Sequence, residues 1–232
     1  RRQRQMCIRD RVKGHGTIGL ITYLRTDSTR IAEEADAAAR AFVKEHYGEN
    51  YMAAGEPAKK NAGKIQDAHE AIRPTDISLT PVMVKESLPR DLFRLYQLIW
   101  KRFAASRMAP AVYETTMVKI RGGNQLFSAA ASRLSFDGFM SVYVDADDEE
   151  EKGQTMGAME KGSALSLEKL EPSQHFTQPP AHYTEASLVK ALEEQGIGRP
   201  STYAPTITTI LARRYVTKEN KNIYVTELGE AV

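Results

Sequence analysis

The chain has one cysteine, Cys7, among its 232 residues, and it lacks any long uninterrupted apolar run. A single cysteine excludes an internal disulfide and a cysteine-based zinc site within this chain. The absence of an apolar run of about twenty residues argues against a membrane-spanning helix. Because 41% of the residues are hydrophobic and 27% are charged, the composition is that of an ordinary globular protein that can bury one large core or several small ones.

A large charge of one sign is also lacking, since the formal net charge is +2. Residues 1–13 nevertheless contain six basic residues and one acid, which leaves a net charge of −3 for the rest. Bulk charge therefore does not indicate nucleic-acid binding, and such a role must rest on local groups. The basic leader has neither helical periodicity nor the apolar segment of a secretory signal. We interpret residues 1–13 as a foreign or disordered leader.

The stretch GLITYLRTDSTRI, residues 19–31, organises the first half of the chain. An apolar, β-branched run over 18–22 predicts a strand. Ser28 is a good N-cap for a helix over 28–47, which ends before Gly48. Tyr23 and Arg25 then lie where the strand passes to the helix. Their spacing of two in an extended chain places both side chains on one face.

Three more helices are predicted in this half of the chain. The first covers 66–73 and ends before Pro74, and on it His69 and Arg73 share a face because they are four residues apart. The second runs over 80–88 from a Thr-Pro start. The third, over 90–107, carries the widest apolar stripe of the sequence and is expected to form core.

Residues 110–177 change to strand character. Alternation over 112–120 precedes a Gly-Gly-Asn turn signal, and further strands are predicted over 126–131, 139–144 and 165–170. Six acids among residues 145–151 predict a solvated loop between them. These features indicate a small antiparallel β domain.

The last part returns to helices. A helix capped by Thr184 ends at Gly196, a second is capped by Ser201, and a hairpin around Asn-Lys-Asn follows. Helix, turn, helix and hairpin are the outline of a winged helix–turn–helix unit. Arg199, Ser201 and Thr202, at the start of the second helix, are candidates for binding a DNA phosphate.

Each candidate site has an ordinary structural alternative. Tyr23 is one of ten tyrosines, and most tyrosines are packing residues with an exposed hydroxyl. His69 and Arg73 form either a surface pair or a phosphate-binding pair. Arg199, Ser201 and Thr202 are equally suited to ordinary capping and turn chemistry.

Three separated motifs carry a resemblance to a known family. They are GLITYLRTDSTRI (19–31), DAHEAIRPT (67–75) and HFTQPPAHYTEASLVKALEEQGIGRPSTYAPTITTILARRYV (175–216). In this order they resemble type IA DNA topoisomerases of the bacterial topoisomerase I group, over about residues 14–232. His182 departs from the family pattern, which has an arginine there, so a DNA contact of that arginine is not carried over.

The resemblance implies a mechanism. Tyr23 would attack a backbone phosphate of single-stranded DNA, Arg25 would stabilise the pentavalent phosphate, and His69 would hydrogen-bond the scissile phosphate. Arg73 would contact the DNA backbone, and Arg199, Ser201 and Thr202 would follow the strand beside the cut. The 5′-phosphotyrosyl bond conserves the energy for religation, so no ATP is needed. The Mg²⁺ of the whole enzyme would have its ligands outside this chain.

The implied fold is α+β with several domains. After the leader, a helical active-tyrosine domain covers 14–109, an antiparallel β hinge domain covers 110–177, and a truncated winged-helix-like DNA-binding domain covers 178–232. The chain is then part of a monomeric enzyme that relaxes negatively supercoiled DNA in the bacterial cytoplasm, at the nucleoid. It has no membrane partner and is inactive as a fragment.

Other readings of the sequence remain open. They are a non-catalytic winged-helix DNA-binding protein, for which Tyr23-Leu24-Arg25 has no use, topoisomerase III, and reverse gyrase, which needs an attached helicase module.

Overall fold

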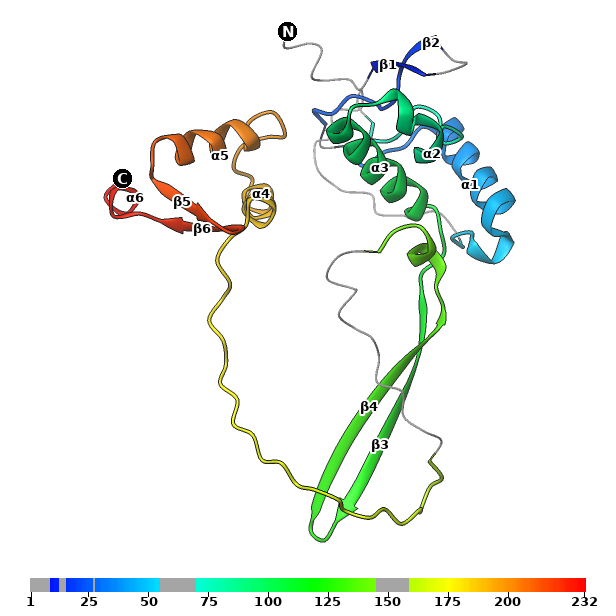
Figure 1. Ribbon diagram of the computed structural model, residues 1–232, viewed down its shortest axis with the longest axis vertical. Helices are drawn as coiled ribbons and strands as arrows, with labels where there is room; N and C mark the ends of the chain where they lie inside the picture. The colour runs from blue at the N-terminus through cyan, green and yellow to red at the C-terminus, as the bar shows by residue number, and fades with distance from the viewer. Residues whose placement is uncertain (1–8, 13–15, 27, 55–69, 145–158) are drawn as a thin grey trace. The chain divides into compact units, whose positions relative to one another are not determined.

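The computed structural model describes residues 9–12, 16–26, 28–54, 70–144 and 159–232 (Figure 1). The chain divides into two compact units, Arg1–Lys161 and Gly162–Val232. In the described ranges, no helix has both the length and the apolar character needed to cross a membrane.

The first unit contains helices, 3-10 turns and two antiparallel strand pairs (Figure 1). The predicted helices over 80–88 and 90–107 are confirmed, the first as a short helix continued by a 3-10 turn. The elements are β1 (Arg9–Val12), β2 (Gly16–Gly19), α1 (Glu33–Tyr47), η2 (Glu49–Tyr51), α2 (Pro81–Val84), η3 (Lys85–Ser87), α3 (Arg90–Ala105), β3 (Val112–Gly122), β4 (Gln125–Phe136) and η4 (Gly138–Ser141).

The core of the first unit lies between α1, α3 and the segments that pack against them. The apolar stripe predicted on α3 consists of Leu92, Leu95, Tyr96, Ile99, Trp100 and Phe103. Tyr96, Trp100 and Phe103 face inward, whereas Leu92 and Leu95 are exposed, so only part of the stripe forms core. The buried cluster consists of Leu20, Ile21, Ala39, Phe42, Val43, Ile77, Leu79, Val84, Leu88, Tyr96, Trp100, Phe103, Ala104, Met108 and Val142. The helical half of the chain is therefore one packed body.

The helix α1 begins later than the sequence predicts. Its first residue is Glu33, whereas Ser28 was expected to cap it. The Ser28 hydroxyl instead accepts a hydrogen bond from the Arg30 amide at 3.2 Å, a local turn that competes with helix formation. Residues 28–32 consequently stay outside the helix and lengthen the stretch that follows Tyr23.

Part of the basic leader is ordered. Residues 9–12 form β1, which pairs antiparallel with β2 in the register Arg9↔Gly19 to Val12↔Gly16. The prediction of disorder is therefore wrong for these four residues. Backbone pairing does not need the side-chain periodicity that the leader lacks.

The predicted β domain is a single long hairpin in the described part of the chain. Strands β3 and β4 pair antiparallel from Val112↔Phe136 to Gly122↔Gln125, as the Gly-Gly-Asn turn indicates. The strand expected over 139–144 is wrong, because Gly138 at φ +48° turns the chain into η4. The strand expected over 165–170 is also wrong, since this exposed stretch pairs with no described strand.

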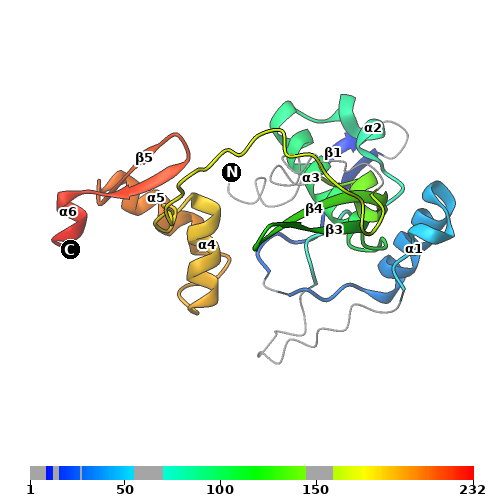
Figure 2. The same cartoon turned by 90° about the horizontal axis from the view of Figure 1, so that it is seen from below.

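The second unit has the predicted order of helix, turn, helix and hairpin. The β5–β6 hairpin lies against α5 in both views (Figure 1, Figure 2). Thr184 caps the first helix through a reciprocal capping box with Ser187. The N-cap of the second helix is Thr202, not the predicted Ser201. The elements are α4 (Glu185–Glu194), α5 (Tyr203–Ala212), β5 (Val216–Glu219), β6 (Asn222–Val225) and α6 (Glu227–Glu230).

Candidate active site

Tyr23 and Arg25 lie on the chain that leaves β2. Both side chains are exposed, Tyr23 with an exposed fraction of 42%. Leu24 between them is partly buried against the core. This alternation agrees with the prediction that the phenol and the guanidinium share one side of the chain.

The chain before Tyr23 is held by main-chain pairing with a distant segment. Ile21 forms an isolated antiparallel bridge with Pro74. On either side of it the Thr22 amide donates to the Arg73 carbonyl at 2.9 Å, and the Thr75 amide donates to the Leu20 carbonyl at 3.0 Å. Because proline has no amide hydrogen, Pro74 tolerates this pairing only at a position where none is required.

The helix predicted over 66–73 is wrong over its described part. Residues 70–73 have an irregular backbone, which lies alongside residues 20–22 and is hydrogen-bonded to them. Residues that pair with a segment about fifty positions away need no recognisable local pattern. The local spacing of residues 66–73 was therefore the only signal, and it favoured a helix. His69, whose placement rested on that helix, lies outside the described residues.

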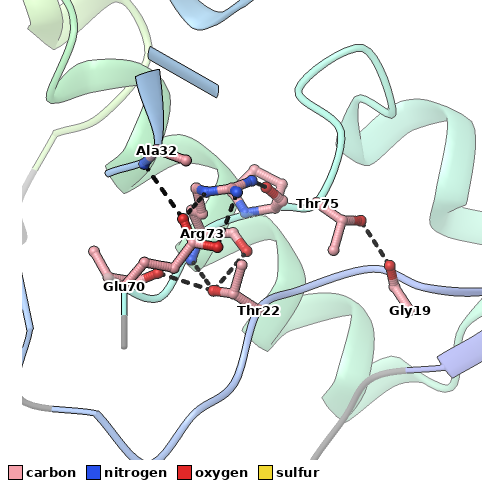
Figure 3. A network of polar contacts seen from close by, with 8 residues as sticks. Gly19, Thr22, Ala32, Glu70, Arg73 and Thr75 are labelled. Atoms are coloured by element: carbon pink, nitrogen blue, oxygen red, sulfur yellow. Dashed lines mark hydrogen bonds and ion pairs between the residues drawn. The ribbon is translucent and has the colours of Figure 1, made fainter. Parts of the chain in front are cut away.

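Two threonine hydroxyls reinforce the pairing (Figure 3). Thr22 Oγ1 donates to the Ala71 carbonyl at 2.9 Å and accepts from the Arg73 amide at 2.9 Å. Thr75 Oγ1 donates to the Gly19 carbonyl at 2.6 Å. Sequence reasoning missed Thr22 as a site residue, although its position directly before Tyr23 was the available signal.

Arg73 is paired with a carboxylate in this structure. Its Nε and Nη2 donate to Glu70 Oε2 and Oε1 at 3.1 and 3.0 Å, and Nη1 donates to the Pro74 carbonyl at 2.9 Å. The Arg73 side chain is 11% exposed. A DNA phosphate bound by Arg73 would therefore have to replace Glu70, and this contact stays a prediction.

A cleft of about 380 Å³ adjoins the stretch that follows Tyr23. Two arginines reach it, but each already has a partner. Arg107 is bonded to Asp36 at 2.5 Å, and the Arg102 guanidinium lies 5.0 Å from the centre of the Tyr143 ring. The lining residues are Ser28, Thr29, Ile31, Ala71, Ile72, Leu98, Ile99, Arg102, Phe103, Ser106 and Arg107.

The second unit places its three candidate residues in one turn before α5. Arg199, Ser201 and Thr202 are all exposed. The Arg199 amide donates to Thr202 Oγ1 at 2.9 Å, and Thr202 Oγ1 donates to the Arg199 carbonyl at 3.0 Å. Gly198, at φ +83°, brings the chain into this turn, a conformation that favours glycine.

The segment before α4 joins the hairpin of the second unit. The Ile223 amide donates to the Tyr183 carbonyl at 2.7 Å, and Thr184 forms a bridge with Asn222. His182, where the motif has an arginine in the family, lies with its ring centre 4.3 Å from that of Tyr224. This histidine therefore packs on the β6 strand.

Of the described candidate residues, Tyr23, Arg25 and Arg73 lie in the first unit. Arg199, Ser201 and Thr202 lie in the second. Among the described residues, no group of three or more His, Cys, Asp or Glu is arranged to hold a metal ion. The catalytic and DNA-binding roles of all these residues stay predictions.

An exposed tyrosine and arginine on a tethered segment, with a separate helix–turn–helix–hairpin unit, agree with the class of DNA-processing enzymes indicated by the motifs. The sequence pattern that defines the DNA topoisomerase family matches residues 15–232, so the chain belongs to this family. Residues 1–13 lie outside the match, and their foreign origin stays a prediction.

The fold supports the same assignment. The structure is similar to full-length topoisomerase I from Thermotoga maritima, with a TM-score of 0.75 and 37% sequence identity. The similarity covers 95% of this chain and 35% of that chain, so this chain spans about a third of its relative's length. The resemblance to bacterial type IA topoisomerases and the α+β fold class are confirmed.

Proposed function

We propose that this chain is the tyrosine-bearing part of a type IA DNA topoisomerase that cuts one DNA strand through a covalent bond to Tyr23. The main support is the placement of Tyr23 and Arg25, which are both exposed while Leu24 between them packs on the core. A reacting phenol must be accessible to the DNA backbone and must also be held in position. The pairing of residues 20–22 with 73–75 supplies the second condition.

The proposed reaction exchanges one phosphodiester for another. The Tyr23 oxygen attacks a backbone phosphorus, the bond from phosphorus to the 3′-oxygen breaks, and the phenolic proton is balanced by protonation of that 3′-oxygen. The products are a 5′-phosphotyrosyl bond and a free 3′-hydroxyl. After another strand has passed, the hydroxyl attacks the phosphotyrosine and restores the DNA, so neither step consumes ATP.

Arg25 is the proposed stabiliser of the transition state. A phenol has an ordinary pKa of about 10 and is a weak nucleophile at neutral pH. A guanidinium on the phosphate neutralises the charge that develops on its oxygens, and this is typically the largest single contribution to catalysis. His69 is proposed to donate a hydrogen bond to the same phosphate, and Arg73 to contact the backbone after exchange of its Glu70 partner.

The second unit is proposed to follow the DNA strand beside the cut. Its outline is that of a winged helix–turn–helix. Arg199, Ser201 and Thr202 are exposed before the ten-residue helix α5, where main-chain amides and a cation favour a phosphate. Removing one phosphate contact at Arg199 should lower the salt dependence of binding by about one ion.

Several properties belong to the whole enzyme and are proposed for it. They are relaxation of negatively supercoiled DNA, action as a monomer, a cytoplasmic location at the nucleoid, and a requirement for Mg²⁺. The described residues of this chain do not provide a cluster that fits a metal ion, so no step above depends on one. The 232-residue chain alone is expected not to relax plasmid DNA.

Covalent trapping tests this function. The full-length enzyme that contains this chain is incubated with labelled single-stranded oligonucleotide, denatured, and examined for a protein–DNA adduct. We expect the adduct with the wild type and none with Tyr23→Phe. Tyr113→Phe is the matched control, because Tyr113 is an exposed tyrosine of the same unit. An adduct that survives Tyr23→Phe would reject the assignment.

A further inference from the structure

The stretch that carries Tyr23 has little regular structure of its own. We call residues 22–32 the Tyr23 loop; it lies between β2 and α1. Within its described residues, local contacts run from the Ser28 amide to Thr26 Oγ1 and from the Arg30 amide to Ser28 Oγ. These hydrogen bonds are local, while Leu24 and Ile31 of the loop pack against the core of the unit. The position of a nucleophile on this loop also depends on how the two ends of the loop are held.

Both ends of the Tyr23 loop are bonded to the same short segment, residues 70–75. At the first end, Thr22 exchanges main-chain and hydroxyl hydrogen bonds with Ala71 and Arg73. At the second end, the Ala71 amide donates to the Arg30 carbonyl at 2.7 Å. The Ala32 amide donates to Glu70 Oε2 over a longer 3.4 Å.

Glu70 is the charged group at the centre of this arrangement (Figure 3). Its Oε2 accepts from both Ala32 and Arg73, and its Oε1 accepts from Arg73. The Arg73 main chain, in turn, holds Thr22. One carboxylate thus links the end of the loop to the residue that fixes its beginning.

The burial of the pair makes this link sensitive to charge. The Arg73 and Glu70 side chains are 11% and 27% exposed. Removing one charge from a partly buried pair leaves the other without its partner, so the arginine must move toward solvent or toward another acceptor. Either movement disturbs the Arg73 main chain beside Thr22.

We propose that Glu70 is a positioning residue that clamps the two ends of the Tyr23 loop and so sets the geometry of the attacking phenol. The proposal rests on the proposed function of Tyr23. Glu70 does not touch the DNA. It acts through Arg73, Thr22 and the start of α1. Loss of the clamp therefore slows the cleavage step without weakening DNA binding, because an Arg73 released from Glu70 stays available for the backbone contact proposed above.

The test compares Glu70→Gln with Glu86→Gln in the full-length enzyme that contains this chain. Glu86 is an exposed glutamate of the same unit, on η3. Adduct formation is followed under single-turnover conditions with single-stranded oligonucleotide, and equilibrium binding is measured separately. We expect Glu70→Gln to slow cleavage about ten- to hundredfold with binding no weaker than that of the wild type, and Glu70→Asp to lie between it and the wild type in cleavage rate.

Amide hydrogen exchange gives a second readout that does not depend on catalysis. In Glu70→Gln the amides of Thr22, Ala32 and Ala71 should exchange faster, while that of Trp100 in the core should not. A wild-type cleavage rate for Glu70→Gln, or faster exchange throughout the unit, would overturn the clamp. If the proposed function itself is wrong, Tyr23→Phe will still form the adduct, which distinguishes that failure from a failure of the clamp. In that case amide exchange alone decides whether Glu70 clamps the loop.

Discussion

The phenolic hydroxyl of Tyr96 donates a 2.6 Å hydrogen bond to the main-chain carbonyl of Leu79 in the core of the first unit. One turn further along α3, Trp100 Nε1 donates to the Ile77 carbonyl at 2.9 Å. These bonds fix residues 77–79, which begin two residues after Thr75, the end of the segment that pairs with the chain before Tyr23. Packing of α3 therefore helps to hold residues 73–75, and through them the chain before Tyr23.

Tyr96→Phe is expected to destabilise the first unit by about 1–3 kcal/mol, because it leaves the buried Leu79 carbonyl without a donor. Urea unfolding of the full chain, followed by the fluorescence of the single tryptophan Trp100, measures the change. Tyr113→Phe is the control, since in the described part of the chain the Tyr113 hydroxyl donates to a weak acceptor, the Met140 sulfur. Equal unfolding midpoints for the two variants would contradict this account.

The same hydroxyl predicts a loss of stability in alkali. Burial, together with the charge of Asp76, raises the pKa of Tyr96 above its ordinary value of 10.0. A tyrosine whose folded pKa is raised contributes stability that is fully present below the unfolded pKa and is lost as pH rises toward the folded pKa. Tyr96→Phe should therefore remove part of the alkaline decline.

Asp36 predicts the behaviour in acid. Burial raises the pKa of its carboxyl group, but hydrogen bonds from Arg40 and Arg107 outweigh burial and hold the pKa below its ordinary value of 3.8. A carboxylate with a lowered folded pKa stabilises the protein above the unfolded pKa, and this contribution is lost as pH falls through the folded pKa. The first unit should therefore lose stability as pH falls below 3.8.

Asp36→Asn should cost about 1–3 kcal/mol at neutral pH, since it leaves the largely buried Arg107 without its charged partner. Unfolding midpoints measured between about pH 2 and pH 6 should converge with those of the wild type at the acidic end. Glu45→Gln, an exposed change on the same helix, should leave the midpoint unchanged. A constant gap between Asp36→Asn and wild type at all pH values would show that the charge is not responsible.

The sequence predicted the elements whose signals are local. The stripe of α3, the Thr184 cap of α4 and the turn between β5 and β6 each lie within a few residues of what they determine. The spacing of Tyr23 and Arg25 predicted a shared face, and both side chains are exposed in the structure. The order of the three family motifs identified the family without any structural information.

The parts that the sequence missed depend on partners far along the chain. Thr22 bonds to Ala71 and Arg73, 49 and 51 residues away, and Glu70 reaches back 38 residues to Ala32. Residues 66–73 have helical spacing, but in the described residues 70–73 backbone pairing with the distant residues 20–22 overrides such a preference. Local sequence patterns do not indicate such distant partners. The helix was therefore predicted, and the contacts of Glu70 were not.

Gly138 explains why the strand expected after β4 does not form, and it offers a sharp stability test. Its φ is +48°, and a Cβ there would lie 2.5 Å from the Ala109 carbonyl oxygen and 2.6 Å from that of Pro110. Gly138→Ala therefore combines backbone strain with a clash against main chain, and it should cost about 2–4 kcal/mol.

Gly123→Ala is the matched control for this change. Gly123 also has a positive φ, +59°, but nothing lies within 4 Å of an added Cβ. This variant should cost only about 1 kcal/mol of backbone strain. Trp100 fluorescence in urea measures both variants. Similar costs would mean that the close approach of Ala109 and Pro110 relaxes without penalty.

A second glycine pair tests the DNA-binding role proposed for the turn before α5. Gly198 has a φ of +83°, and an added Cβ would lie 2.8 Å from Thr202 Oγ1, whereas Gly196 at +70° faces open space. Gly198→Ala should therefore displace the Thr202 hydroxyl from Arg199, while Gly196→Ala adds backbone strain alone. The comparison separates the geometry of the turn from general strain in the loop.

Binding of the full chain to a labelled single-stranded oligonucleotide, measured by fluorescence anisotropy, should weaken about tenfold for Gly198→Ala and by less than about threefold for Gly196→Ala. Circular dichroism would confirm that α5 remains helical in both. The difference should shrink at high salt, because the contacts that are lost are to phosphates. If both variants bind equally well, the bond between Arg199 and Thr202 does not shape the DNA-binding surface, and α5 would have to approach DNA through other residues.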